Sequence, residues 1–123
     1  MNLNSILIGS EDPARLADYY TKLLGAPVMN EGGYTTWVIG SGAITVGAHD
    51  QVKGRNTEPG RLIWNIETPD VKGDFARMQA AGATVVAEPY TMDMDGLPSE
   101  AWIATLSDPD GNYFQLTGPF DMG

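Results

Sequence analysis

Near its end the chain reads Ser107-Asp108-Pro109-Asp110-Gly111-Asn112-Tyr113-Phe114-Gln115-Leu116. Pro109 fixes the backbone φ angle, Asp side chains bond the backbone of such turns, and Gly111 supplies a positive φ. Polar and apolar residues alternate on both sides of the turn, which is the pattern of paired strands. The segment therefore predicts a β-hairpin whose second strand carries Phe114 on one face and Gln115 on the other.

A weak internal repeat predicts that the chain contains two similar modules. Gly25-Ala26-Pro27-Val28 matches Gly82-Ala83-Thr84-Val85, and Ile6-Leu7-Ile8 before Asp12 matches Trp64-Asn65-Ile66 before Asp70. The repeats lie about half the chain apart, which is typical of a duplicated supersecondary unit.

The first module is predicted to be a strand, a helix and three further strands. Asp12 and Pro13 form an N-cap and N1 pair, and the helix runs to Leu24, where Gly25 stops it. Leu16 and Tyr20 belong to the apolar face of this helix. Strands are expected at residues 3–8, 28–30, 34–39 and 43–48.

The second module repeats this order. Asp70 caps a helix that Gly82 ends, and strands are expected at residues 62–67, 84–89, 101–106 and 112–117. Polar residues 51–60 are predicted to link the modules, and residues 90–100 to form a long loop with Met92, Met94 and Gly96. We therefore expect one α+β domain over residues 1–123, with modules at 3–50 and 61–118.

The hairpin, the helix with Asp12, Tyr20 and Leu24-Gly25, and the βαβββ repeat together resemble the vicinal oxygen chelate superfamily. This superfamily includes glyoxalase I, bleomycin-resistance proteins and extradiol dioxygenases. The resemblance covers residues 3–118 and implies two βαβββ modules that form a cupped mixed sheet with helices on its outer face. It also implies a ligand in the cup and a homodimer.

Alternation along the strands predicts which side chains face the cup. Ile6 and Ile8 are expected under the first helix, and Leu62, Trp64 and Ile66 under the second. The ligand-binding residues expected on the other side or at its mouth are Ser5, Leu7, Thr45, Arg61, Ile63, Asn65, Trp102, Tyr113 and Gln115.

The metal positions of metal-dependent relatives correspond to Ser5, Thr45, Ile63 and Gln115, and the last is usually a Glu in those relatives. A divalent first-row metal prefers imidazole or carboxylate ligands. This set offers two hydroxyls, an alkyl chain and an amide. The sequence therefore predicts no metal at this site and no cofactor.

Other candidate residues each have two interpretations. His49, the only histidine, is either a general base at the rim of the cup or a solvated residue that opens the linker. Glu88 points into the cup or into solvent, and Arg61 binds an anionic group or forms a surface salt bridge. Trp37 and Trp102 stack on a flat ligand or fill the core. No residue is singled out as catalytic.

The acidic composition argues against two classes of partner. The chain has 16 Asp and Glu against 7 Lys and Arg, a net charge of −9, and this charge repels nucleic acid and anionic lipid. It has no Cys, and therefore no disulfide or thiolate nucleophile. No basic, apolar leader stands at the N-terminus and no apolar stretch is long enough to cross a bilayer, so we expect a cytoplasmic protein.

Three functions remain open. The favoured one is a metal-free binding protein that sequesters a small, partly aromatic ligand in the cup. The second is a metal-independent or substrate-assisted enzyme with lyase, isomerase or oxygenase-like chemistry. The third is a non-catalytic interaction subunit.

Overall fold

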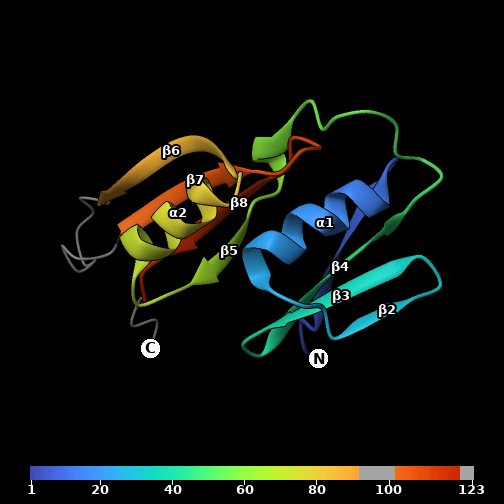
Figure 1. Cartoon of the computed structure of the whole chain (residues 1–123), viewed down its shortest axis with the longest axis horizontal. Helices are drawn as coiled ribbons and strands as arrows, with labels where there is room; N and C mark the ends of the chain where they lie inside the picture. The colour runs from blue at the N-terminus through green and yellow to red at the C-terminus, as the bar shows by residue number, and fades with distance from the viewer. Residues whose placement is uncertain (92–101, 120–123) are drawn as a thin grey trace. The chain divides into compact units, whose positions relative to one another are not determined.

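The computed structural model describes residues 1–91 and 102–119. The chain divides into two compact units, Met1–Asn56 and Thr57–Gly123. Each unit contains one four-stranded mixed sheet and one α-helix, so the α+β order βαβββ occurs twice, as predicted (Figure 1).

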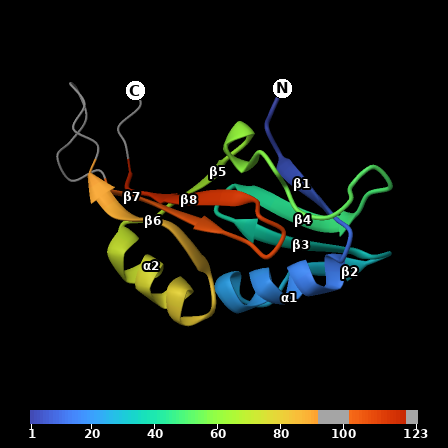
Figure 2. The same ribbon diagram turned by 90° about the horizontal axis from the view of Figure 1, so that it is seen from above.

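The first unit contains β1 (Ser5–Ser10), α1 (Pro13–Leu24), β2 (Met29–Glu31), β3 (Tyr34–Ile39) and β4 (Gly42–Ala48). Its strand order is β1-β4-β3-β2, with β1 parallel to β4 and the other pairs antiparallel. Figure 2 shows α1 lying along one face of this sheet. The other face carries no helix of this unit.

The second unit repeats this topology. A 3₁₀ turn (Pro59–Arg61) precedes β5 (Trp64–Glu67), α2 (Val71–Ala80), β6 (Thr84–Thr91), β7 (Trp102–Ser107) and β8 (Tyr113–Thr117). The strand order is β5-β8-β7-β6, and β5 is parallel to β8 just as β1 is parallel to β4. Helix α2 lies along one face of this sheet (Figures 1 and 2).

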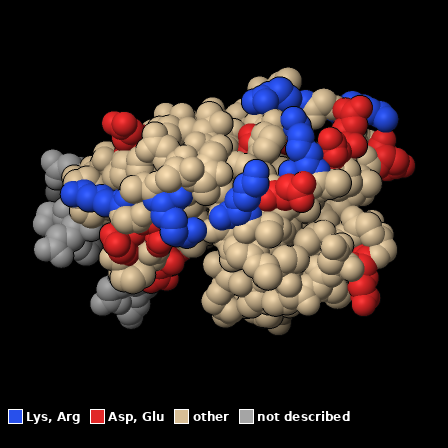
Figure 3. Space-filling view, in the orientation of Figure 1, with Lys and Arg blue, Asp and Glu red and all other residues tan. Residues whose placement is uncertain are grey.

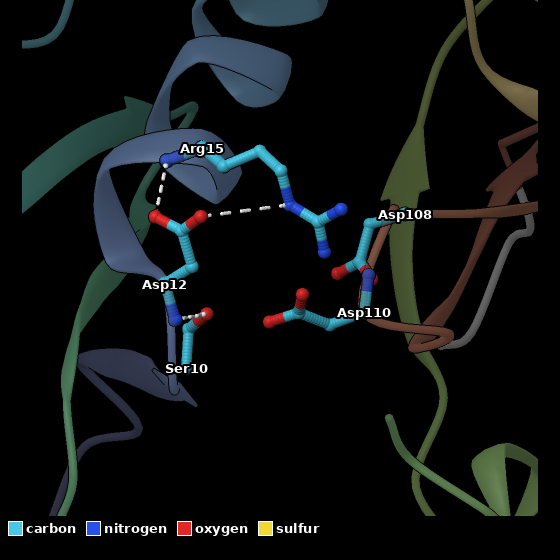
Figure 4. Close-up of polar contacts among 5 residues, drawn as sticks. All are labelled: Ser10, Asp12, Arg15, Asp108 and Asp110. Atoms are coloured by element: carbon cyan, nitrogen blue, oxygen red, sulfur yellow. Dashed lines mark hydrogen bonds and ion pairs between the residues drawn. The ribbon is translucent and has the colours of Figure 1, made fainter. Parts of the chain in front are cut away.

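The predicted Asp residues are the N-caps of both helices, and they make the same two kinds of hydrogen bond. The Asp12 carboxylate accepts a hydrogen bond from the Arg15 backbone N–H at 3.3 Å, while the Asp12 N–H donates to Ser10 Oγ at 3.0 Å (Figure 4). The Asp70 carboxylate accepts from the Gly73 N–H, and the Asp70 N–H donates to Thr68 Oγ1. These bonds satisfy backbone donors that a helix start leaves unpaired.

The core of the first unit forms between α1 and the sheet. Leu16, Tyr20 and Leu23 of α1 are buried, and the Tyr20 ring lies 6.0 Å from that of Trp37 on β3. Trp37 is 2% exposed, and its Nε1–H donates to the Gly25 carbonyl at 3.0 Å. Trp37 therefore fills the core, which was one of its two interpretations.

The core of the second unit forms beneath α2. Trp64 of β5 stacks on Phe114 of β8 with ring centroids 5.1 Å apart. Phe75 and Met78 of α2 are buried. The Lys72 ammonium lies 3.7 Å from the centre of the Trp102 ring, which places Trp102 on the helix side of the sheet.

The Asp-Pro-Asp-Gly turn has the predicted role in the structure. Asp108 is buried, and its Oδ1 accepts hydrogen bonds from the backbone N–H groups of Asp110 and Asn112. Gly111 has a φ of 84°, the positive value that the turn requires. Asp108 and Asp110 are therefore residues of the turn, and the Asp108 carboxylate stabilises it.

Several predicted strand boundaries were wrong, most by one residue, and three strands differ by two residues. The first strand is Ser5–Ser10, so it begins later than residue 3 and continues past residue 8. The fifth strand begins at Trp64, where pairing with β8 starts, and Leu62 is 72% exposed instead of lying under the helix. Tyr90 and Thr91 are in β6, not in a loop, because they pair with β7 beyond Pro89. An edge strand such as β6 tolerates proline. The rest of the predicted loop, with Met92, Met94 and Gly96, lies outside the described residues.

No helix in residues 1–91 and 102–119 is long and apolar enough to cross a membrane.

We expect Gly25→Ala to lower the free energy of unfolding by about 1–3 kcal/mol, because a Cβ is strained in this backbone region. Gly25 ends α1 with φ 91° and ψ −168°. Gly60→Ala is the matched control, since an added Cβ at Gly60 would meet no atom within 4 Å and Gly60 has no positive φ. Urea denaturation of both variants tests the prediction, and equal losses would contradict it.

Candidate functional site

The face of each sheet opposite its helix is called the open face. On β1 the side chains alternate as predicted, with Leu7 56% exposed and Ile8 8% exposed. On β4, Ile44 and Val46 are buried, and Thr45 between them is on the open face. The predicted register of these strands is therefore confirmed.

Three polar residues form a row across the open face of the second sheet. Asn65 on β5 is paired with Gln115 on β8, and Gln115 is paired with Thr105 on β7. The Gln115 Nε2 donates a hydrogen bond to Thr105 Oγ1 at 3.1 Å. Asn65 is exposed, Gln115 is half-buried and Thr105 is buried. We call Asn65, Gln115 and Thr105 the polar row.

The rows on either side of the polar row carry further polar groups. Tyr113 is paired with Ser107 on one side. On the other side Glu67 is paired with Thr117, and Glu67 is exposed. Glu67 was missed as a site residue by the sequence analysis, although the alternation that placed Asn65 on the open face also places Glu67 there.

The open face of the first sheet is more apolar. At its centre the hydroxyls of Thr36 and Thr45 lie 2.8 Å apart and share a hydrogen bond. Leu7 is paired with Thr45, and Met29 with Thr36. The exposed large apolar side chains of this sheet are Leu7, Met29, Tyr34 and Val38. Figure 3, which shows the helix side of this unit, also has few charged groups over β2 and β3, but the apolar character of the open face rests on the exposed side chains above.

Gly47 allows the Tyr34 ring to lie directly against β4. A Cβ at Gly47 would collide with the ring atoms of Tyr34. The aromatic ring is therefore held against the sheet by a glycine that leaves room for it.

The structure does not bring all predicted site residues to the open faces. Arg61 lies in the 3₁₀ turn before β5 and forms an exposed ion pair with Glu58 at 2.9 Å. Ile63 is half-buried but precedes β5. Trp102 lies on the helix side, because it alternates in phase with buried Ala104 and Leu106. Ser5 is exposed at the start of β1, paired with Ala43.

His49 follows β4 in the first unit, and Glu88 is on β6 of the second unit. The backbone N–H of Gln51 donates to His49 Nδ1 at 3.1 Å, and the His49 side chain is 47% exposed. Glu88 is exposed on the edge strand β6. His49 therefore opens the linker as a partly solvated residue, in line with one of its two interpretations.

The donor set does not suit a divalent cation. Thr45 bonds Thr36, and Gln115 bonds Thr105, so the polar groups at these two positions are already engaged with neutral partners. Ser5 is paired with Ala43 and not with Thr45, and Ile63 supplies no ligand atom. Within residues 1–91 and 102–119, no three His, Asp or Glu side chains gather as a potential metal site.

Comparisons with known proteins identify the family. The family model of the glyoxalase-like domain matches residues 5–117. The chain therefore belongs to the glyoxalase-like domain family, and its fold is the one expected from the resemblance to the vicinal oxygen chelate superfamily. No curated protein matches the chain significantly.

Several solved structures share this fold. A glyoxalase-related enzyme from Fulvimarina pelagi is 18% identical with a TM-score of 0.74, over 97% of this chain and 88% of that one. A glyoxalase/bleomycin resistance protein/dioxygenase family enzyme from Burkholderia phytofirmans PsJN is 18% identical with a TM-score of 0.73, over 96% and 98%. A similarly described protein from Alicyclobacillus acidocaldarius is 18% identical with a TM-score of 0.72, over 98% and 92%. At this identity the likeness defines the fold and not the activity.

Replacement of Gln115 by Glu is expected not to create a tight metal site. On the two neighbouring strands the new carboxylate would have the Asn65 amide and the Thr105 hydroxyl beside it, whereas protein zinc sites use three or four imidazole, thiolate or carboxylate ligands. Calorimetric titration of the variant with Zn²⁺ and Ni²⁺ measures its affinity for each metal. Asn65→His combined with Gln115→Glu is the matched comparison and should bind Zn²⁺ more tightly. One equivalent of tightly bound metal in Gln115→Glu alone would refute the argument.

Proposed function

We propose that this protein binds a small, partly aromatic molecule on the open face of its second sheet and does so without a metal ion. The observation that carries the proposal is the polar row of Asn65, Gln115 and Thr105. Gln115 and Thr105 are bonded to each other and Asn65 is exposed, so the row offers an exposed amide beside an amide that a neighbouring hydroxyl holds, and small-molecule sites use such placed polar groups to orient a ligand.

The residues around the polar row support binding of a flat, partly polar ligand. Tyr113 lies two residues from Gln115 on β8 and shares its face, so an aromatic ring is available beside the amides. Small-molecule sites combine apolar and aromatic surface with a few polar groups that set orientation. Asn65 supplies both a donor and an acceptor, and it is the exposed member of the row.

The first sheet supports the same function through a different surface. Leu7 is exposed beside Thr45, and the Thr36–Thr45 pair supplies hydroxyl groups at the centre of a face that also exposes Met29, Tyr34 and Val38. Contiguous exposed apolar residues on a small domain mark interaction sites. We propose that Leu7 and Thr45 also contact small molecules.

Metal independence is part of the proposal because Gln115 offers a neutral amide and not a carboxylate. The position that is usually a Glu in metal-dependent relatives is Gln115, whose amide bonds a neutral hydroxyl. A neutral amide provides no charge to offset the cost of removing water from a divalent cation.

We also propose that the protein is a cytoplasmic homodimer. The strands β2 and β6 form sheet edges, and exposed edges favour pairing with another chain. Light scattering at micromolar concentration should give twice the mass of 13.2 kDa per chain. A monomeric mass throughout this range would contradict the assembly without affecting the binding proposal.

Asn65→Leu should weaken ligand binding and leave the melting temperature unchanged or raise it. The variant removes an exposed polar group that the proposal assigns to the ligand and adds apolar surface. A thermal-shift screen of aromatic metabolites and antibiotics would first supply a ligand, and titration would then compare its affinity for the variants.

Gln79→Leu is the matched control for this experiment. Gln79 is an exposed residue on α2, so its replacement makes a comparable polar-to-apolar change away from the open face. The control should bind the ligand normally. If Asn65→Leu unfolds the protein instead, Asn65 belongs to a structural network and its assignment to the site is wrong.

A further inference from the structure

The Gln115 amide is held with its two ends in different environments. Its nitrogen donates to Thr105 Oγ1 at 3.1 Å, and Thr105 is only 6% exposed. The oxygen Oε1 is bonded to the same carbon as the nitrogen and is therefore turned away from Thr105. Within residues 1–91 and 102–119, no protein donor bonds this oxygen. The amide thus presents an acceptor on the open face.

The charged side chains on the described strands of the second sheet are carboxylates. Glu67 lies two residues from Asn65 on the same face, and its carboxylate only accepts hydrogen bonds. Among the strand residues 64–67, 84–91, 102–107 and 113–117, the charged residues are Glu67 and Glu88, and none is a Lys or Arg. Arg61 precedes β5 and is paired with Glu58, while Lys72 lies over Trp102 on the helix side.

Resting on the proposed function, we infer that the ligand presents a hydrogen-bond donor to Gln115 Oε1, such as an amine, an amide N–H or a hydroxyl, and not a carboxylate or phosphate. Thr105 is the positioning residue for this specificity, because it holds the amide nitrogen and leaves Oε1 for the ligand. An anionic group placed at Gln115 would meet the acceptor oxygen Oε1 with the Glu67 carboxylate on the same face, and the described strands of the second sheet carry no Lys or Arg to compensate.

The test uses three small aromatic probes of similar size: benzylamine, benzyl alcohol and benzoate. The full ¹⁵N-labelled chain is titrated with each probe while the side-chain amide signals of Asn65 and Gln115 are followed by NMR. We expect benzylamine to bind about tenfold more tightly than benzoate, with benzyl alcohol between them. A salt concentration of about 0.3 M reduces long-range attraction to the acidic protein.

Variants separate the local effect from the overall charge. Thr105→Val removes the hydroxyl, frees the amide to turn and should bring the affinities for benzylamine and benzoate closer together. Thr105→Ser keeps the hydroxyl and should keep the selectivity. Gln115→Met, at a half-buried position, should also reduce the selectivity and serves if Thr105→Val does not fold. All three variants keep the net charge of −9, so a change in selectivity among them arises at the site.

Each outcome has a distinct meaning. Benzoate binding as tightly as benzylamine to the unmodified chain would overturn the inference and leave the proposed function standing. Unchanged selectivity in both Thr105→Val and Gln115→Met would overturn the role of the polar row. If none of the probes shifts the Asn65 or Gln115 signals, the open face does not bind such ligands, and the proposed function fails together with the inference.

Discussion

The hydroxyl–carboxylate cap at the start of each helix is the interaction on which each unit depends. Ser10 and Asp12 make it in the first unit, and Thr68 and Asp70 make it in the second. The cap fixes the residue at which the strand ends and the helix begins, and thereby fixes which helical side chains meet the sheet. Because one face of each sheet must be covered by apolar residues of its helix, the strand register is fixed as well, since a slip by one residue would exchange the two faces.

Once one face is buried, the opposite face can differ in chemistry between the two units. The equivalent rows are Leu7, Thr45 and Thr36 in the first sheet and Asn65, Gln115 and Thr105 in the second. In each row the second and third residues form a hydrogen bond with each other. The bond joins two hydroxyls in the first sheet, and an amide and a hydroxyl in the second. The outermost residue is an exposed Leu in one unit and an exposed Asn in the other. The two units thus share one topology, but the row on the open face is more apolar in the first and more polar in the second. Function depends on such differences between side chains and not on the fold.

The amide at Gln115 connects the family to the proposed function. The resemblance to the vicinal oxygen chelate superfamily implies a carboxylate at this position in metal-dependent members, whereas here an amide is bonded to Thr105 and is a neutral group. Recognition by such a group depends on hydrogen-bond direction more than on charge. The hydrogen bonds at Gln115 therefore bear on the chemistry of the ligand, whereas the likeness to solved structures defines only the fold.

The sequence by itself determined the order of the elements, the two Asp caps, the Asp-Pro-Asp-Gly turn and the faces of β1, β4 and β8, because each depends on local conformation or on alternation within one strand. Local pattern could not place Leu62 and Arg61, since the start of β5 is set by its pairing with β8. Nor could it place Trp102 beneath Lys72, because an aromatic residue suits either face of a strand. The hydrogen bond between Gln115 and Thr105 joins residues on neighbouring strands whose register is a property of the sheet. Only the tertiary structure decided that this amide presents its oxygen on the open face, because the partner that orients it is brought alongside by strand pairing.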